Sequence, residues 1–269
     1  MTGASDIASK IPARSSKSHK YTSGHVLIFA GEMKGAASLA GLGALRGGAG
    51  LVTIAGGVKN FPEAIVLNEK ADFGKYIKQK KVRAVVFGPG FGRTSPARAA
   101  DVLEILSKTD VPKVIDADGI FLVKKYGYLK KLKNCVMTPH TGEAKILTGG
   151  PLAAPRSWNT VKKLSSRLRA VLAIKGHRTA ISDGKTVMIN PTGNPVLAAG
   201  GTGDLLAGIM AGFIAQGMGV FDSARAAVYV HGLAADLFMK KNGNRGALVR
   251  DIASLLPGAI KIVREERMA

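Results

Sequence analysis

Short, continuously apolar runs recur along the chain, and each is followed by glycine or polar residues. Runs this short, without polar alternation, are typical of strands buried on both faces of a parallel sheet. They lie at 26–30, 51–55, 84–87, 113–115, 135–137 and 171–174. Segments with helical spacing of apolar residues lie at 35–46, 95–107, 204–216, 223–240 and 251–267. This alternation predicts an α/β fold with a mostly parallel central sheet and helices on both faces.

Two further apolar runs, 180–182 and 187–189, flank Asp183-Gly184-Lys185-Thr186. This arrangement predicts a β-hairpin, which would give the sheet an antiparallel edge. The first twenty residues are dominated by Ser, Lys and Ala, and no linker or internal repeat follows them. We therefore expect a flexible N-terminal segment over 1–20 and a single domain over 21–269.

The conspicuous polar and glycine motifs lie directly after the expected strands. Gly88–Gly92 follows one strand, Asp116–Asp118 the next, Thr138–Glu143 a third and Lys175-Gly176 a fourth. Ligands of open parallel sheets bind outside the carboxyl ends of the strands. The motifs are therefore expected to share one active site.

The segment Asn190–Asp204 (NPTGNPVLAAGGTGD) ends at the start of an expected helix with an apolar face. Its glycines free the backbone to direct several N–H groups at an anion, and the helix dipole adds to the attraction. Asp204 at this position has two interpretations. It is either a capping carboxylate or a general base beside an anion site, where it would take a proton from a hydroxyl that attacks phosphate.

Two segments match familiar nucleotide-binding motifs only in part, and we do not interpret them as such sites. Gly184-Lys185-Thr186 has the end of a P-loop, but Thr179 stands where that pattern begins with glycine. Gly41-x-Gly43 lies inside an expected helix and is followed by Arg46 where the dinucleotide fingerprint has a small residue.

Composition narrows the classes of protein. The chain has 269 residues, 46% of them apolar, and a net charge of +21. The basic residues are spread out, and the densest stretch, Lys124–Lys133 with five lysines, lacks the frame of a nucleic-acid reader. We interpret the charge as a solvated basic surface that would also attract anionic substrates.

Compartment is indicated by cysteine usage and hydropathy. The single cysteine, Cys135, excludes an intrachain disulfide, which fits a reducing compartment. The N-terminus lacks a secretory h-region, and the apolar run Leu205–Ala215 is too short to span a bilayer. We expect a cytoplasmic protein with no membrane partner.

Five motifs occur in one order: Gly88–Gly92, Asp116-Ala117-Asp118, Thr138–Glu143, Ile174-Lys175-Gly176 and Asn194–Asp204. In this order the chain resembles the ADP/ATP-dependent NAD(P)H-hydrate dehydratase family of the ribokinase-like superfamily. The resemblance implies a ribokinase-like three-layer α/β/α fold and repair of hydrated NADH or NADPH. An adenine nucleotide, with ADP the expected donor, would phosphorylate the ring hydroxyl with Mg²⁺ present, and elimination of phosphate would restore the cofactor.

The resemblance also implies roles for individual residues. Asp204 would be the catalytic base, and the amides of Gly201, Thr202 and Gly203 would form the anion hole. The nucleotide would contact two loops, which comprise Lys175, Gly176, His177, Arg178, Thr179, Asn194, Pro195, Val196, Leu197, Ala198, Ala199, Gly200, Gly201, Thr202 and Gly203. The hydrated cofactor would contact Ala36, Gly90, Gly92, His140 and Asp204.

Several of these residues have a second interpretation. Glu143 would face magnesium-bound phosphates, or it is a first-turn helix residue. His140 would contact the substrate, or it is a loop histidine with satisfied hydrogen bonds. Asp116 and Asp118 form a candidate carboxylate pair, although Asp116 could cap a turn. His231 is interpreted as a core residue.

The chain departs from the family pattern at Thr141, where a proline is usual, and at Glu32-Met33-Lys34, where small residues are common. The resemblance further implies a homo-oligomer, and any epimerase is expected to be a separate protein. One alternative is a ribokinase-like kinase for a thiazole or pyrimidine alcohol, which would share Asp204. Another is a basic nucleic-acid-binding protein, which the intact Gly200–Asp204 segment disfavours.

Overall fold

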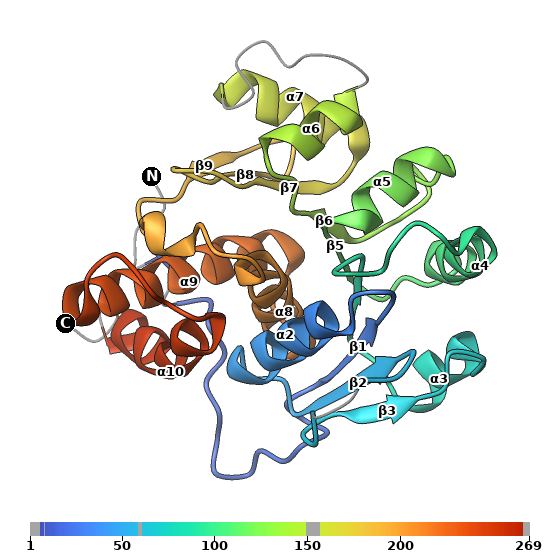
Figure 1. The fold of residues 1–269 in the computed structure, drawn as a ribbon, viewed down its shortest axis with the longest axis horizontal. Helices are drawn as coiled ribbons and strands as arrows, with labels where there is room; N and C mark the ends of the chain where they lie inside the picture. Colours follow the sequence, from blue (N-terminus) through green and yellow to red (C-terminus); the bar gives the residue numbers. More distant parts are fainter. Residues whose placement is uncertain (1–5, 8, 59–60, 149–156, 266–269) are drawn as a thin grey trace.

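The structure, a computed structural model, describes residues 6–7, 9–58, 61–148 and 157–265. Within them, nine strands form one sheet in the order β3-β2-β1-β4-β5-β6-β7-β8-β9 (Figure 1). The strands are β1 His25–Phe29, β2 Leu51–Ala55, β3 Ile65–Leu67, β4 Ala84–Phe87, β5 Lys113–Ile115, β6 Cys135–Met137, β7 Val171–Ile174, β8 Ala180–Ser182 and β9 Val187–Ile189. Strands β1 to β7 are parallel, whereas β8 pairs antiparallel with both β7 and β9. The predicted mostly parallel sheet with an antiparallel edge is confirmed.

Helices cover both faces of the sheet (Figure 1). One layer comprises α2 Lys34–Arg46, α8 Thr202–Ala215, α9 Val220–Asn242 and α10 Val249–Glu265. The other comprises α3 Phe73–Gln79, α4 Pro96–Ser107, α5 Asp118–Lys125, α6 Thr141–Thr148 and α7 Trp158–Leu168. Alternate residues of β1 pack on opposite faces of the sheet. Val26 and Ile28 belong to the core cluster on one face, and Leu27 and Phe29 belong to the cluster on the other. This alternation follows from the two-residue period of a strand.

Close contact between α2 and α8 holds α8 in place. A Cβ atom at Gly208 of α8 would overlap the carbonyl oxygen of Ala40, and one at Gly43 of α2 would overlap that of Leu205. Only glycine at these positions lets the two backbones approach so closely. From Leu205 to Ala215 every residue of α8 is buried, so the first turn of this helix is held firmly at the edge of the sheet.

The N-terminal segment packs on the domain in the part that the structure describes. Ile7 and Ile11 are buried in the α2–α8–α9–α10 core cluster. Arg225 of α9 forms ion pairs with Asp6 and Asp222. Burial of these two apolar side chains attaches this part of the segment to the domain, and the flexibility expected over 1–20 stays a prediction.

The boundaries of the long helices were predicted to within a few residues, whereas β3, α3, α5 and α7 were missed, and α6 was anticipated only through the first-turn interpretation of Glu143. None of the helices in the described part of the chain is long and apolar enough to cross a membrane.

Candidate active site

Four loops that follow parallel strands meet at the carboxyl edge of the sheet, as predicted. The Gly92 N–H donates to Asp118 Oδ2 at 3.0 Å, which joins the loops after β4 and β5. The Lys175 ammonium lies 2.7 Å from Asp116 Oδ1, which joins the loops after β5 and β7. His140 forms an isolated parallel bridge with Lys175, which links the loop after β6 to the same group. The first turn of α8 lies against this cluster, since a Cβ atom at Gly203 would be 3.3 Å from Lys175 Nζ.

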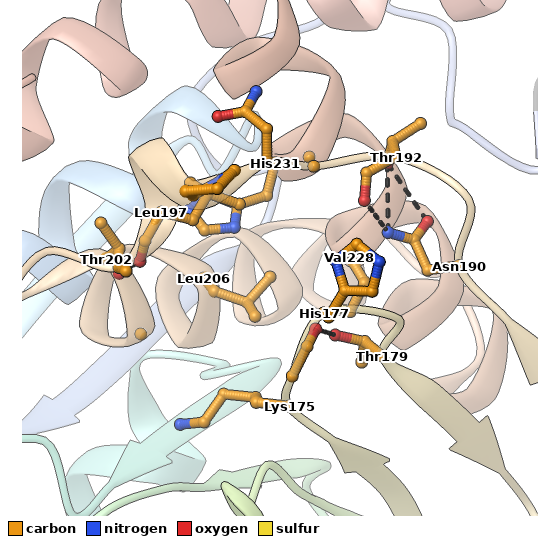
Figure 2. Close-up of a pocket in the computed structure, with 17 residues that line it drawn as sticks. Lys175, His177, Thr179, Asn190, Thr192, Leu197, Thr202, Leu206, Val228 and His231 are labelled. Atoms are coloured by element: carbon orange, nitrogen blue, oxygen red, sulfur yellow. Dashed lines mark hydrogen bonds between the residues drawn. The ribbon is translucent and has the colours of Figure 1, made fainter. Parts of the chain in front are cut away.

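A cavity of about 350 Å³ lies between the loop after β7, the segment before α8, and α9 (Figure 2). It is lined by most of the residues predicted to bind nucleotide: Lys175, Gly176, His177, Thr179, Asn194, Pro195, Leu197, Ala198, Thr202 and Gly203. Arg178, Val196 and Ala199 are not among its lining residues, and Val196 is buried in the core instead. The predicted nucleotide loops therefore form two walls of one cavity, which we call the α9-side cavity.

Asp236 of α9 holds the segment before α8 in place. Its two carboxylate oxygens accept hydrogen bonds from the Gly193 N–H at 3.0 Å and from Asn194 Nδ2 at 2.8 Å. Asn194 Oδ1 in turn accepts from the Val196 N–H at 2.9 Å and caps the short 3₁₀ helix η1, Pro195–Leu197. These hydrogen bonds tie the loop before α8 to α9.

Several residues of the α9-side cavity were missed by sequence reasoning: Asn190, Thr192, Leu206, Val228, His231 and Gly232. Thr192 Oγ1 donates to the Tyr229 carbonyl at 2.8 Å, and a Cβ atom at Gly232 would overlap that hydroxyl. The Gly232 position was the available signal, because a glycine inside a long helix often marks a close backbone approach. His231 is buried as predicted, and burial lowers the pKa of its imidazole to about 4.

A second cavity of about 450 Å³ lies on the other side of the α8 N-terminus, next to α2. We call it the α2-side cavity. Its lining residues are Met33, Gly35, Ala36, Leu39, Gly90, Arg93, Ala117, Asp118, Glu143, Gly200, Gly201 and Asp204. Three residues predicted to contact the hydrated cofactor, Ala36, Gly90 and Asp204, are therefore brought together here.

Gly92 and His140, which were also expected to contact the hydrated cofactor, do not line this cavity. A Cβ atom at Gly92 would overlap the Glu32 side chain, which fills that space and binds Thr94. His140 Nδ1 accepts hydrogen bonds from the backbone N–H groups of Gly142 and Glu143. The backbone N–H of His140 donates in turn to Glu143 Oε2. This reciprocal arrangement caps α6, so the side chains of His140 and Glu143 serve the helix start.

The two cavities meet at the first turn of α8. Thr202 and Gly203 line the α9-side cavity, whereas Gly200, Gly201 and Asp204 line the α2-side cavity. Gly201 has φ +91°, a left-handed conformation that glycine adopts without strain and that turns the chain into the helix. Thr202 Oγ1 is committed to the carbonyls of Leu197 and Ala199 at 2.8 and 2.9 Å. The N–H groups of a first turn have no intrahelical acceptor and can therefore face an anion, although the Thr202 N–H already donates to the Ala199 carbonyl at 3.4 Å.

Asp204 has the electrostatics of a proton acceptor. Burial and, to a lesser extent, the nearby Asp116 carboxylate raise the pKa of its carboxyl, and the Lys175 ammonium offsets part of this effect, which leaves the pKa at about 6. A carboxylate with a pKa close to neutral is ionised at pH 7 yet takes up a proton readily. A group of this kind beside an anion site can activate a hydroxyl for attack on phosphorus.

Sequence comparison identifies the family of the chain that carries this site. A model of the NAD(P)H-hydrate dehydratase family matches residues 26–258. The chain belongs to the NAD(P)H-hydrate dehydratase family.

Two relatives of this dehydratase family differ in length. The bifunctional NAD(P)H-hydrate repair enzyme Nnr of Coxiella burnetii is 34% identical over 257 residues, which cover 90% of this chain and 51% of that protein. The chain thus spans about half the length of that relative. The ADP-dependent (S)-NAD(P)H-hydrate dehydratase of Bacillus subtilis is 31% identical over 265 residues, with 93% of this chain and 94% of that protein covered.

A solved structure of the dehydratase family has the same fold. It is the ADP/ATP-dependent NAD(P)H-hydrate dehydratase from Bacillus subtilis, co-crystallised with ATP and Mg²⁺. Its TM-score is 0.84 and its identity 30%, with 97% of each chain covered. The predicted ribokinase-like three-layer fold is confirmed.

Proposed function

We propose that the protein is an ADP-dependent (S)-NAD(P)H-hydrate dehydratase, which phosphorylates the hydroxyl of hydrated NADH or NADPH and eliminates phosphate. The observation that carries this proposal is the meeting of two cavities at the first turn of α8. A phosphoryl donor in the α9-side cavity and a hydroxyl acceptor in the α2-side cavity would face each other across residues 200–204. Asp204 stands on the acceptor side of that turn, where a base is needed.

The first step would be phosphoryl transfer to the ring hydroxyl. Asp204 accepts the hydroxyl proton as the oxygen bonds to the terminal phosphorus of the nucleotide. The bond from that phosphorus to the bridging oxygen breaks, so ADP leaves AMP and ATP leaves ADP. The amides of Gly201, Thr202 and Gly203 would stabilise the negative charge on the phosphoryl oxygens.

The second step would be elimination. The ring carbon–oxygen bond breaks with release of inorganic phosphate, and the neighbouring ring carbon loses a proton to restore the double bond. Phosphate is a far better leaving group than hydroxide, which is why phosphorylation makes the dehydration feasible. The apolar part of the α2-side wall, Met33, Ala36 and Leu39, suits the nicotinamide ring.

Binding of the nucleotide would rest on the two loops of the α9-side cavity, 175–179 and 194–203. Lys175 supplies a positive charge where these loops approach α8, and Asn194 keeps its loop rigid through Asp236. Proteins usually hold Mg²⁺ with one or two carboxylates plus the phosphate oxygens. We propose this mode for Mg²⁺ here, with the nucleotide phosphates supplying most of its oxygen ligands.

Glu143 is the carboxylate proposed to face magnesium-bound phosphates, since it lines the α2-side cavity next to the junction. Its Oε2 atom accepts from the His140 backbone N–H, and its Oε1 atom lies 3.6 Å from His140 Nε2, so magnesium-bound phosphates would compete with His140 for this carboxylate. When bound, Mg²⁺ neutralises charge on the phosphates during transfer.

Incubation with hydrated NADH, Mg²⁺ and either ADP or ATP tests the proposal. Recovery of the reduced-nicotinamide absorbance with one donor would establish the reaction and the donor together. A stable phosphate ester without recovery would identify an ordinary kinase of the same fold. Absence of both outcomes with both donors would refute phosphoryl transfer to this substrate, and the same assay with hydrated NADPH compares the two forms.

We further propose that the protein forms a homo-oligomer. Ile65 and Val66 are exposed on the edge strand β3, and exposed apolar edges are commonly covered in assemblies. Light scattering coupled to size-exclusion chromatography measures the mass, and a monomer would contradict the proposal.

A further inference from the structure

Asp116 and Lys175 form a buried ion pair directly below the first turn of α8. Each is the first residue after its strand, Asp116 after β5 and Lys175 after β7, and β6 lies between them in the sheet. Asp116 Oδ1 lies 2.7 Å from Lys175 Nζ, with side chains 2% and 23% exposed. The pair therefore spans three neighbouring strands at the carboxyl edge and is shielded from most of the solvent.

The pair lies at the point where the two cavities meet. A Cβ atom at Gly203 would be 3.3 Å from Lys175 Nζ and 3.7 Å from Asp116 Oδ2. Lys175 lines the α9-side cavity, and Asp204, one residue after Gly203, lines the α2-side cavity. In Figure 2 the Lys175 side chain extends away from His177 and Thr179, out of the middle of the cavity. Its ammonium is thus drawn towards Asp116, beside α8.

The backbone around Asp116 has a single, strained arrangement. Ala117 has φ +49° and ψ −124°, a combination that residues other than glycine rarely adopt. It separates Asp116, which binds Lys175, from Asp118, which binds the Arg93 guanidinium at 2.8 Å and the Gly92 N–H at 3.0 Å. Such strain persists where the surroundings over-determine the conformation, and it gathers at functional sites.

We propose that Asp116 is a positioning residue that holds the Lys175 ammonium at the junction of the two cavities, in reach of the phosphoryl group in transfer. The inference rests on the proposed function. A lysine carries its charge on a flexible four-carbon stem, so without a partner it samples many positions. Asp116 also keeps Lys175 from pairing with Asp204, which would occupy the base.

The charged groups around Asp204 come from several elements. Asp116 and Lys175 face it from the loops after β5 and β7. Arg93, Asp118 and Glu143 line the same cavity from the loops after β4 and β5 and from α6. The pH dependence of Asp204 therefore reports on the Asp116–Lys175 pair only when the other three residues are left unchanged.

Three variants test the inference: Asp116→Asn, Lys175→Met and the double variant. In Asp116→Asn we expect kcat to fall on the order of 10²-fold, because misplacing one group at a reacting centre has an effect of that size. The acid limb of the pH profile of kcat/KM is expected to move to lower pH, since a carboxylate is lost and Lys175 is released towards Asp204. In Lys175→Met the same limb is expected to move to higher pH.

The double variant separates positioning from an independent role. If Asp116 acts through Lys175, the double variant is no slower than Lys175→Met alone, because residues that act together give non-additive losses. It also leaves no charge of the pair unmatched, so it is the variant best able to fold, and thermal melts verify all three. Losses that multiply in the double variant, or an unmoved acid limb in Asp116→Asn, would overturn the inference.

A readout without turnover keeps this inference apart from the proposed function. NMR titration of the Asp204 carboxyl in the free protein measures its pKa in the wild type and in each variant. A lower pKa in Asp116→Asn and a higher one in Lys175→Met support the arrangement even if no hydrated cofactor is repaired. Identical titrations in the wild type, Asp116→Asn and Lys175→Met would refute the arrangement even if repair is observed.

Discussion

Replacing Asp204 by asparagine removes the carboxylate and preserves the shape of the side chain. In the folded protein the pKa of Asp204 is raised from 3.8 to about 6, chiefly by burial. A rise of about two units corresponds to roughly 3 kcal/mol against the ionised form. Asp204 lines a cavity and keeps some contact with solvent, so screening reduces this figure. A first-turn carboxylate also stabilises its helix by about 0.3–1 kcal/mol.

The burial effect is larger than the effect of the helix dipole, so Asp204→Asn is expected to be more stable than the wild type by about 1–2 kcal/mol at pH 7. The sign follows from linkage. A carboxyl whose folded-state pKa lies above its unfolded value stabilises the protein at low pH, and that stability is lost as pH rises from about 4 to about 6. The advantage of asparagine therefore grows over this interval and is constant at higher pH.

The same substitution is expected to lower the rate of cofactor repair by about 10²–10⁴-fold, the usual effect of losing a general base. In the wild type kcat/KM is expected to rise with pH through the pKa of Asp204, near 6. Chemical denaturation at several pH values and the absorbance assay, on the same preparations, measure both effects. Near-normal turnover together with reduced stability would show that Asp204 only caps α8, and the reasoning would be wrong.

Three further outcomes follow from local geometry. Gly208→Ala should lower the free energy of unfolding by about 2 kcal/mol or more, because the added Cβ would overlap the Ala40 carbonyl. Gly200→Ala is the control, since Gly200 has open space around it, and this variant should melt like the wild type. Equal melting temperatures for the two variants would contradict the prediction. Buried Lys113 has a pKa lowered to about 8 by burial, so the wild type should gain stability relative to Lys113→Met as pH rises from about 8 to about 10; parallel urea-denaturation profiles would argue against it. His140→Ala should cost about 1 kcal/mol through loss of the α6 cap, whereas His140→Asn should keep most of that stability. A large increase in KM for the hydrated cofactor in His140→Asn would instead place His140 against the substrate.

The sequence was informative about the edge of the sheet where the site lies. Apolar runs such as 84–87 mark strands whatever their neighbours are, and parallel strands present their following residues at one edge. The start of α8 was predictable because Gly201 and the apolar face after Asp204 belong to one local pattern. A site formed by contiguous residues could thus be proposed without a structure.

The features that the sequence did not reveal depend on the order of strands in the sheet and on contacts between residues far apart in the chain. Lys175 meets Asp116 because β6 alone separates β5 from β7, and strand order cannot be read from strand periodicity. His231 looked like an ordinary core residue, since burial gives the same apolar pattern whether or not a cavity lies beside it. The cap formed by His140 was hidden for another reason: a histidine nitrogen can replace the usual Ser or Asp side chain at a helix start.

The separation of the two cavities has a consequence for the order of events in catalysis. They are lined by different residues, which lie on two sides of the turn 200–204, so neither ligand has to leave before the other enters. Transfer would then occur directly within a ternary complex, with no phosphorylated enzyme between the half-reactions. Double-reciprocal plots of initial rate at several fixed nucleotide concentrations would accordingly intersect, and each ligand could slow the escape of the other.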